Sequence, residues 1–361
     1  MDKIKMKNAI TTITLFGGIL FGFFTSQYIE QQKTPPPIHW KIQSQAPEQN
    51  PDYQTLVEFT EKVKTMSAGR LNITPYPQGA ITKGAGIFTG VKKGTTQMAL
   101  GWPNWWLKED MGWAAIQSGP YDFMNIDASM LYFFEGEGME LANKLAAPQG
   151  ILWRPAWWAG MEFGILSNTQ IKGLDDLKGK KIRIGPGVPA DTLIEAAGAF
   201  STPITPEEII PLAGSGLLDG VEWTVPGATL MLGFEKAYPY LIAPAVWQPS
   251  VLADFLINKE AYDALPADLQ AILESAIKDF TITTTLRSKN IDITAFNKFS
   301  EDGYTINTWS KEDLNRWKQA SDKIYRRYRD RSESFNKIYE SKMNYKSRYD
   351  EYYKTYGPYD K

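Results

Sequence analysis

The sequence predicts an α/β protein of two lobes, each a sheet covered by helices, followed by a long helical segment. Strand-like and helix-like stretches alternate twice, over residues 38–102 and again over 163–223, which is typical of sheets flanked by helices. A length of 361 residues suggests two domains, and 43% apolar residues supply their cores. From about Ala261 onward the chain reads as helix, with apolar residues spaced three or four apart.

The first alternation reads as β-α-β-α-β. "IHWKIQSQ" is a strand, "DYQTLVEFTEKVKTMSAGRL" has a helical rhythm, and "LNITPYP" is a second strand. A short helix and a strand that ends at Trp102 follow. The pattern predicts an open parallel sheet.

The second alternation includes the stretch "KIRIGPGVPADTLIEAAGAF". Here we predict a strand, a turn over Gly185–Pro189 and a helix over Ala190–Phe200. The chain is expected to cross between lobes near residues 155–163. We therefore assign residues 38–160 to lobe I, completed by parts of 248–310, residues 161–247 to lobe II, and residues 311–361 to a helical extension.

The first 37 residues differ in composition from the rest. Three lysines precede the apolar run "AITTITLFGGILFGFF", which is short for a membrane span, and "QQKTPPP" follows as an extended spacer. This arrangement is typical of an export signal or of an uncleaved N-terminal anchor. We expect a folded part outside the cytoplasmic membrane, in the periplasm.

The composition excludes several kinds of site. There is no cysteine and one histidine, His39, so thiolate chemistry, iron–sulfur clusters and His-rich metal sites are ruled out. We interpret His39 as a strand residue rather than a catalytic base. Because 39 basic residues balance 41 acidic ones, no nucleic-acid surface is indicated.

Arg183 stands inside a strand where a buried parallel sheet prefers Val or Ile. Gly185, Gly187 and Ala190 satisfy a loose G-x-G-x-x-A spacing. Pro186 and the arginine argue against a phosphate turn. Ligands of open α/β sheets lie beyond the carboxyl ends of strands, so Arg183 is placed to meet an anion there.

Several motifs resemble the DctP-type solute receptors of tripartite ATP-independent periplasmic (TRAP) transporters. They are "GRLNITPYPQGAI", "LDDLKGKKIRIGPG", "SGLLDGVEWTVPG" and "FLINKEAYDALPADLQAILESA". "SFNKIYESKMNYKSRY" resembles the C-terminal helix of the branch that binds 2-oxo and 2-hydroxy monocarboxylates. The resemblance runs from about Ile38 to the end and implies a periplasmic-binding-protein-like fold of two lobes around a cleft with hinge strands.

The resemblance also implies roles for individual residues. Arg183 would clamp the substrate carboxylate by a bidentate pair, which suits a guanidinium fork; a salt bridge to a structural carboxylate is the alternative. Glu222 would bind a metal ion through its carboxylate, and Trp223 through its backbone carbonyl. Glu162, with Phe163 as the neighbouring alternative, would supply the third ligand to metal and substrate, at the position where the branch carries a glutamine. The Trp223 side chain would line the cleft against the substrate, with a place in the core as its alternative.

A departure from the family pattern bears on the metal. With Glu162 in place of glutamine, two glutamates, a substrate carboxylate and Arg183 sum to a charge of minus two. Ca²⁺ would neutralise this cluster and accepts oxygen ligands, whereas Na⁺ would leave it anionic. We therefore expect Ca²⁺ rather than Na⁺, and no organic cofactor.

The opposite wall of the cleft should come from "GWPNWWLKEDMGW". Trp102 and Trp105 are the expected lining residues, and half of the four tryptophans should be core. Tyr121, in "SGPYDF", is a further expected substrate contact. Apolar walls would strengthen the carboxylate–arginine pair by excluding water.

The C-terminal segment carries a tyrosine-rich stripe at helical spacing that continues to Tyr356. Such a stripe must wrap the body or meet a partner. The resemblance suggests a homodimer through the C-terminal helices.

These observations predict a solute-binding receptor and not an enzyme, capturing a pyruvate- or lactate-like acid for a TRAP membrane permease. Three alternatives stay open: a membrane-anchored sensor of the same fold, a receptor for dicarboxylates or sugar acids, and a lyase or hydrolase that uses Glu162, Glu222 and a metal-bound water. A dicarboxylate receptor should need a second basic residue in the cleft.

Overall fold

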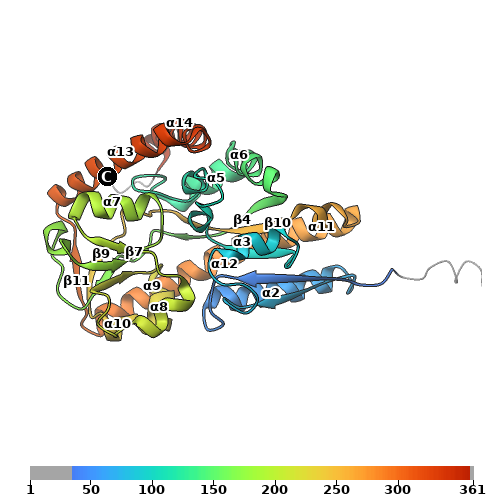
Figure 1. The fold of residues 1–361 in the computed structure, drawn as a ribbon, viewed down its shortest axis with the longest axis horizontal. Helices are drawn as coiled ribbons and strands as arrows, with labels where there is room; N and C mark the ends of the chain where they lie inside the picture. The colour runs from blue at the N-terminus through green and yellow to red at the C-terminus, as the bar shows by residue number, and fades with distance from the viewer. Residues whose placement is uncertain (1–34, 358–361) are drawn as a thin grey trace, which may run out of the picture. The chain divides into compact units, whose positions relative to one another are not determined.

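The structure is a computed structural model that describes residues 35–357 (Figure 1). The predicted export signal or anchor therefore lies almost wholly outside the described residues. No helix in the described range is both long enough and apolar enough to cross a bilayer. The chain from His39 onward forms one compact unit.

Lobe I is built on a five-stranded sheet. Its strands, in spatial order, are β2 (Leu71–Tyr76), β1 (Ile38–Ser44), β3 (Met98–Gly101), β10 (Val251–Asn258) and β4 (Ile151–Gly160). All eight residues of β10 are buried, so this strand lies at the centre of the core.

Lobe II is built on a six-stranded sheet. Its strands, in spatial order, are β11 (Thr305–Thr308), β9 (Tyr240–Ala243), β5 (Ile165–Ser167), β8 (Gly220–Glu222), β6 (Lys181–Arg183) and β7 (Phe200–Thr202). β6 lies between β7 and β8 and is parallel to both. Arg183 is thus the last residue of an interior strand.

Both sheets are mixed. β1 and β3 pair in parallel, as expected for the first alternation, but other strands run in the opposite direction. In lobe I, β10 runs antiparallel to β3 and to β4. In lobe II, β5 runs antiparallel to β8 and to β9. The chain leaves lobe I through β4 and returns to it through β10. These two strands therefore run in opposite directions, and an antiparallel pair needs no crossover helix between its strands.

Helices cover both sheets. The helices that come before α12 (Ala267–Glu301) in the chain are α2 (Pro51–Met66), α3 (Gly86–Lys92), α4 (Trp113–Ile116), α5 (Ile126–Phe134), α6 (Gly138–Ala146), α7 (Val188–Ala197), α8 (Pro206–Leu212), α9 (Pro226–Leu232), α10 (Phe234–Ala237) and α11 (Lys259–Asp263). α2 begins sharply because the Asn50 side chain accepts a hydrogen bond from the Asp52 amide and Pro51 occupies the first helical position.

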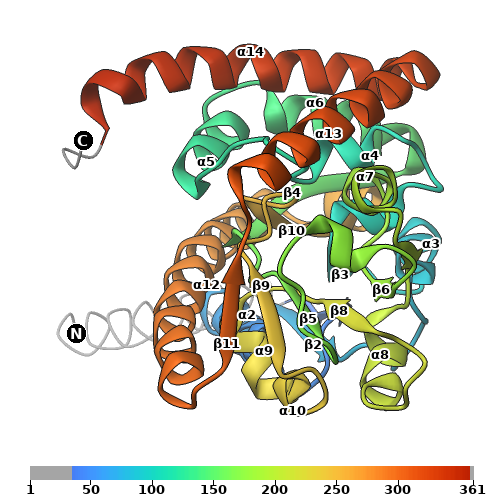
Figure 2. The same cartoon turned by 90° about the vertical axis from the view of Figure 1, so that its left-hand side faces the viewer.

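One helix serves both lobes. α12 (Ala267–Glu301) packs on α2 and β4 of lobe I and on α9 of lobe II. Figure 2 shows it running past both sheets. Any movement of one lobe against the other must therefore be accommodated along α12.

The C-terminal helices also contact both lobes. α13 (Lys311–Arg331) packs on α7 of lobe II, and α14 (Glu333–Tyr356) packs over α4, α5 and α6 of lobe I (Figure 2). Phe335, Ile338 and Tyr349 of the tyrosine-rich stripe are buried against this body, whereas Tyr352 and Tyr356 are exposed. Most of the stripe therefore wraps the protein's own body.

Three details differ from the predicted elements. β11 interrupts the C-terminal segment that was expected to be helical. The helix predicted over Ala190–Phe200 is α7, which begins at Val188 and ends at Ala197. Phe200 instead starts β7, because Gly198 adopts φ 64°, a left-handed conformation that ends the helix.

A buried ion pair fixes α14 to lobe I. Lys342 Nζ lies 2.6 Å from Asp122 Oδ2, and the two side chains are 4% and 3% exposed. Lys342 Nζ also donates to the Gln117 carbonyl at 3.0 Å. The pair satisfies two charges that would otherwise be isolated in the core.

We expect Lys342→Met to lower the free energy of unfolding by about 3–5 kcal/mol, because it leaves Asp122 charged and buried without a partner. The double variant Lys342→Met/Asp122→Asn should recover part of that loss. The matched control is Lys346→Met on the same helix. The ion pair of Lys346 with Asp350 is more exposed, so its loss should lower the free energy of unfolding by less than about 1 kcal/mol. Urea unfolding measures all three, and a loss below about 1 kcal/mol for Lys342→Met would contradict the anchoring role.

Candidate functional site

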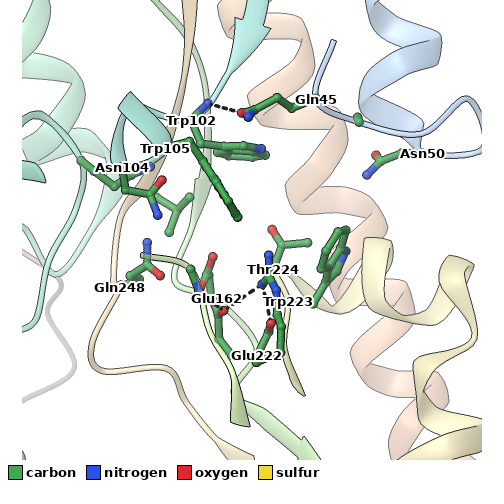
Figure 3. Close-up of a pocket in the computed structure, with 15 residues that line it drawn as sticks. Gln45, Asn50, Trp102, Asn104, Trp105, Glu162, Glu222, Trp223, Thr224 and Gln248 are labelled. Atoms are coloured by element: carbon green, nitrogen blue, oxygen red, sulfur yellow. Dashed lines mark hydrogen bonds and ion pairs between the residues drawn. The ribbon is translucent and has the colours of Figure 1, made fainter. Parts of the chain in front are cut away.

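A pocket lies between the two lobes and offers about 50 Å³ to water-sized spheres (Figure 3). Lobe I contributes one wall and lobe II the other. The lining residues are Gln45, Ala46, Asn50, Trp102, Asn104, Trp105, Gln117, Glu162, Arg183, Gly185, Glu222, Trp223, Thr224, Gln248 and Val251. Arg183 is the one basic residue in this set.

Arg183 is held at the end of β6 by three hydrogen bonds. Its Nε donates to the Ile204 carbonyl at 3.1 Å, and its Nη1 donates to the Glu222 carbonyl at 2.7 Å and to Glu222 Oε2 at 3.2 Å. Among the described residues none accepts a hydrogen bond from Nη2, and the residue is 4% exposed. The guanidinium is therefore fixed in direction and keeps donor capacity at the pocket.

Two carboxylates share this buried environment. Glu222 is 1% exposed and Glu162 is 6% exposed. Burial first, and then the neighbouring Glu222, raise the pKa of Glu162 well above its ordinary value, while Arg183 acts in the opposite direction. Burial lowers the pKa of Arg183, against the two glutamates, which raise it. The charged form of Glu162 is therefore disfavoured in this environment.

Trp223 follows Glu222 and closes one side of the site. The Arg183 guanidinium carbon lies 4.9 Å from the centre of the Trp223 ring, within cation–π range. Phe234 meets the same ring edge-on at 5.4 Å between centroids. The indole Nε1 is buried without a hydrogen-bond partner, which leaves it available to a ligand.

Tryptophans from lobe I form the opposite wall. Trp102 and Trp105 line the pocket, whereas Trp106 and Trp113 are buried in the core of lobe I. Half of the four tryptophans are therefore core residues, as predicted. Gly101 permits this wall, because a Cβ there would lie 2.5 Å from the Trp106 ring and 2.7 Å from Gln45 Oε1. Gln45 Oε1 in turn accepts a hydrogen bond from the Trp102 amide at 3.0 Å.

The lobes touch across the pocket. Asn104 Nδ2, on the lobe I wall, donates to the Pro186 carbonyl at 3.2 Å, in the turn that follows Arg183. A Cβ on Gly185 would lie 3.0 Å from the same nitrogen. This close approach is what a closed cleft requires.

The turn after β6 does not form a phosphate cradle. The Gly185 amide donates to Glu222 Oε2 at 3.2 Å, so the protein's own carboxylate occupies the position that an anion would need. Pro189 lies in the first turn of α7 and has no amide proton to offer. The dinucleotide spacing in the sequence therefore has no functional counterpart here.

The structure brings together six of the seven residues predicted for the site. Arg183, Glu162, Glu222 and Trp223 come from lobe II, and Trp102 and Trp105 from lobe I.

Tyr121 does not line the pocket, so its expected substrate contact is not supported. Its hydroxyl donates to the Leu314 carbonyl of α13 at 2.6 Å. Phe163 is not a lining residue either, because its ring packs 4.8 Å from that of Phe299.

Sequence reasoning missed the amide side chains of the pocket. Gln45, Asn50, Asn104, Gln117 and Gln248 all line it. Four of them come from residues 38–160 and Gln248 from the loop before β10, and they carry no shared spacing, so no local pattern marks them. Of these residues, Gln45 and Asn50 could most readily have been predicted from the sequence. They flank the loop after β1, and loops beyond strand ends supply ligands in α/β folds.

The donor set fits a cation. Glu162 Oε2 is buried and has no hydrogen-bond partner, and Glu222 lies beside it. No group of three or more His, Cys, Asp or Glu side chains that could hold a metal occurs among residues 35–357. A cation here would therefore rely on two carboxylates together with backbone, amide or ligand oxygens, a set that suits Ca²⁺ or Na⁺.

Comparisons with known proteins agree with this geometry. A curated relative, the monocarboxylate 2-oxoacid-binding periplasmic protein of Nostoc sp., is 24% identical over 305 residues, which cover 84% of this chain and 83% of the relative. A solved TRAP periplasmic solute-binding protein of Pseudoalteromonas atlantica, with bound sodium and pyruvate, is 27% identical with a TM-score of 0.83 and coverages of 88% and 97%. One of Colwellia psychrerythraea, with bound calcium and pyruvate, is 26% identical with a TM-score of 0.83 and coverages of 88% and 96%.

The family model for DctP, described as bacterial extracellular solute-binding protein, family 7, matches residues 42–331. The match spans both sheets, the pocket and α13. Members of this family are binding receptors of TRAP transport systems and not enzymes. The chain therefore belongs to the DctP family of TRAP solute-binding proteins.

Proposed function

We propose that this chain captures a small 2-oxo or 2-hydroxy monocarboxylate, such as pyruvate or lactate, together with a cation, and delivers it to a membrane permease. The observation that carries the proposal is the buried Arg183, whose Nη2 has no partner among the described residues, beside two buried carboxylates. The pyruvate-bound relatives support the same ligand class.

The size and charge of the pocket favour a small monoacid over larger acids. A cavity of about 50 Å³ holds only a few water-sized spheres. Arg183 is the only basic lining residue, so a second carboxylate would lack a counter-charge. A dicarboxylate or sugar acid would have to bring its own neutralising ion or open the cleft.

The cation would join the acid to the two glutamates. Glu162, Glu222, Arg183 and one substrate carboxylate sum to minus two when all are ionised. Ca²⁺ balances that charge and Na⁺ leaves one negative charge in a buried site, where unbalanced charge is costly. We therefore propose Ca²⁺, although relatives with sodium and with calcium are both known. The Trp223 carbonyl is a further proposed ligand.

Lobe closure would be the working step. Substrate can drive closure only by binding the closed arrangement more tightly than the open one. Here the tryptophans of lobe I would cover an acid held by Arg183 of lobe II, so both walls are complete only when the cleft is closed. The permease would recognise that form, and residues 1–37 would direct export to the periplasm.

We further propose that a second copy of the chain covers the end of α14. Tyr352 and Tyr356 are 59% and 71% exposed, and their rings stack 5.0 Å apart. Large aromatic surfaces of this kind are typical of interfaces rather than of free helix ends.

Arg183→Ala should weaken pyruvate binding at least about 30-fold, because the acid loses its counter-charge in a buried site. Arg183→Lys should recover little, since an ammonium cannot form a two-pronged pair. Thermal shifts of the full chain with increasing pyruvate, in calcium, measure both. Arg154→Ala is the control, as Arg154 pairs with Glu274 outside the pocket. An unchanged shift in Arg183→Ala would contradict the clamp.

Ligand-free stability should depend on pH through Glu162. Its raised pKa means that the folded protein keeps a proton that the unfolded chain releases above about pH 4.5. The unfolded state then binds fewer protons, so stability falls as pH rises from that value toward the folded pKa. Urea unfolding in chelator between about pH 5 and about pH 8 should show a shallower fall for Glu162→Gln than for the parent. The control Glu140→Gln, on the surface of α6, should show the same pH dependence as the parent. If the free energy of unfolding of Glu162→Gln falls with pH as steeply as that of the parent, Glu162 is not the group responsible.

Tyr352→Ser/Tyr356→Ser should convert a dimer into a monomer, since it removes the exposed aromatic surface of α14. Sedimentation equilibrium of the full chain measures the change. Phe200→Ser alters an equally exposed aromatic on β7 and should leave the dimer intact. A parent chain that sediments as a monomer at micromolar concentration would reject this interface.

A further inference from the structure

A second, smaller pocket lies where α2 of lobe I and α9 of lobe II meet α12. It offers about 10 Å³ to water-sized spheres, which is about one such sphere. Its lining residues include Pro51, Asp52, Val225, Thr284, Ser288 and Asp292. None of them lines the solute pocket.

Asp52 is a buried carboxylate without a counter-charge. It is 7% exposed. Its backbone is engaged, because the amide donates to Asn50 Oδ1 at 2.9 Å and the carbonyl accepts from Thr55 Oγ1 at 2.9 Å. No described residue donates a hydrogen bond to its carboxylate or forms an ion pair with it. A buried carboxylate in this condition is costly unless something neutralises it.

The second carboxylate of the pocket is only partly balanced. Asp292 Oδ1 accepts from the Gly227 amide of α9 at 3.1 Å, and its Oδ2 lies 3.2 Å from Lys289 Nζ. Arg287 also lines the pocket, but its charge is paired with Glu58, whose Oε1 lies 2.9 Å from Arg287 Nη1. Asp52, Asp292 and Lys289 therefore sum to one uncompensated negative charge when ionised.

Neutral oxygens complete a donor set. Thr284 is 2% exposed, and its Oγ1 is buried without a hydrogen-bond partner. Thr284, Ser288 and Asp292 recur every four residues along α12, which places them on one face of the helix. Burial first, and then the charge of Asp292, raise the pKa of Asp52 to about 8, with no compensating hydrogen bond. Both causes disfavour the charged form of Asp52, and a cation bound beside it would oppose them.

We propose that this pocket binds one monovalent cation, with sodium as the fitting ion, between Asp52, Asp292 and the Thr284 hydroxyl. Its single positive charge matches the single uncompensated negative charge. A hard cation also accepts carboxylate and hydroxyl oxygens together. This site is separate from the Glu162–Glu222 site and does not depend on the identity of the solute.

The position of the cation connects it to the solute pocket. Asn50 and Thr224 line the solute pocket, while their chain neighbours Pro51 and Val225 line this one. The ion would tie the start of α2, in lobe I, to Asp292, whose other oxygen holds the start of α9 in lobe II. It therefore favours the arrangement in which the lobes are in contact, and by linkage sodium and solute should each strengthen the binding of the other.

The test is the thermal midpoint of the full chain at about pH 9, where Asp52 is ionised, without solute. Sodium chloride replaces N-methylglucamine chloride at constant ionic strength. For the parent, each tenfold rise in sodium above its dissociation constant should raise the midpoint by about 2–4 °C. Asp52→Asn should remove this dependence, and Thr284→Val should shift it to about tenfold higher sodium.

Asp279→Asn is the matched control, since it removes a carboxylate of α12 that pairs with Lys62 outside the pocket; it should keep the sodium dependence. Sodium bound at the Glu162–Glu222 site would persist in Asp52→Asn and be lost in Glu222→Gln, so the two sites are distinguishable. Broadening of the ²³Na resonance by the parent but not by Asp52→Asn is a second readout, independent of folding stability. The proposal would be overturned if the thermal midpoint did not change with sodium concentration, or if it changed equally in the parent and in Asp52→Asn. A proton would then be what neutralises Asp52.

Discussion

The buried pair between Arg183 and Glu222 is the interaction on which the site depends. Two charges at the end of interior strands are costly to bury, and they are tolerated because the Glu222 carboxylate and carbonyl both accept from Arg183 Nη1. Glu162 adds a second carboxylate that the arginine alone cannot balance. The pocket is therefore incomplete in charge, and a ligand with its cation would supply what is missing.

The same logic extends to the way the lobes are joined. α12 packs on both lobes, and α13 and α14 contact lobe II and lobe I respectively, so helices join the lobes in addition to the crossing strands β4 and β10. Contacts across the cleft are both polar, as at Asn104 and Pro186, and apolar, since Val188 packs in the lobe I cluster that contains Ala114. A closed state whose cleft contains unbalanced charge would respond to the ions and acids that bind there.

Much of this architecture could be predicted from the sequence, for identifiable reasons. The alternation of strands and helices indicated two lobes, and an arginine within a strand indicated an anion site. β11 is only four residues long, too short for a strand period to stand out in a helical segment. β5 lies where a strand was expected, but its antiparallel direction was not predicted, because a buried strand reads the same in either direction.

Tyr121 shows where local reasoning fails within the site. Its neighbourhood in the chain suggested the pocket, but its φ of 57° and its hydrogen bond to Leu314, 193 residues away, direct it to α13. The amide side chains of the pocket are a similar case, since only the tertiary fold brings Gln45, Asn50 and Gln248 together. Arg183, Glu222 and Trp223 could be found because they lie in two short motifs at strand ends.

The most direct test of the central claim is a crystal structure of the chain grown with pyruvate and calcium. The account predicts the acid's carboxylate within hydrogen-bond distance of the Arg183 guanidinium, about 3 Å, and a cation bound by oxygens of Glu162, Glu222 and the acid. An acid bound away from Arg183, or bound there with both glutamates free of any cation, would contradict it.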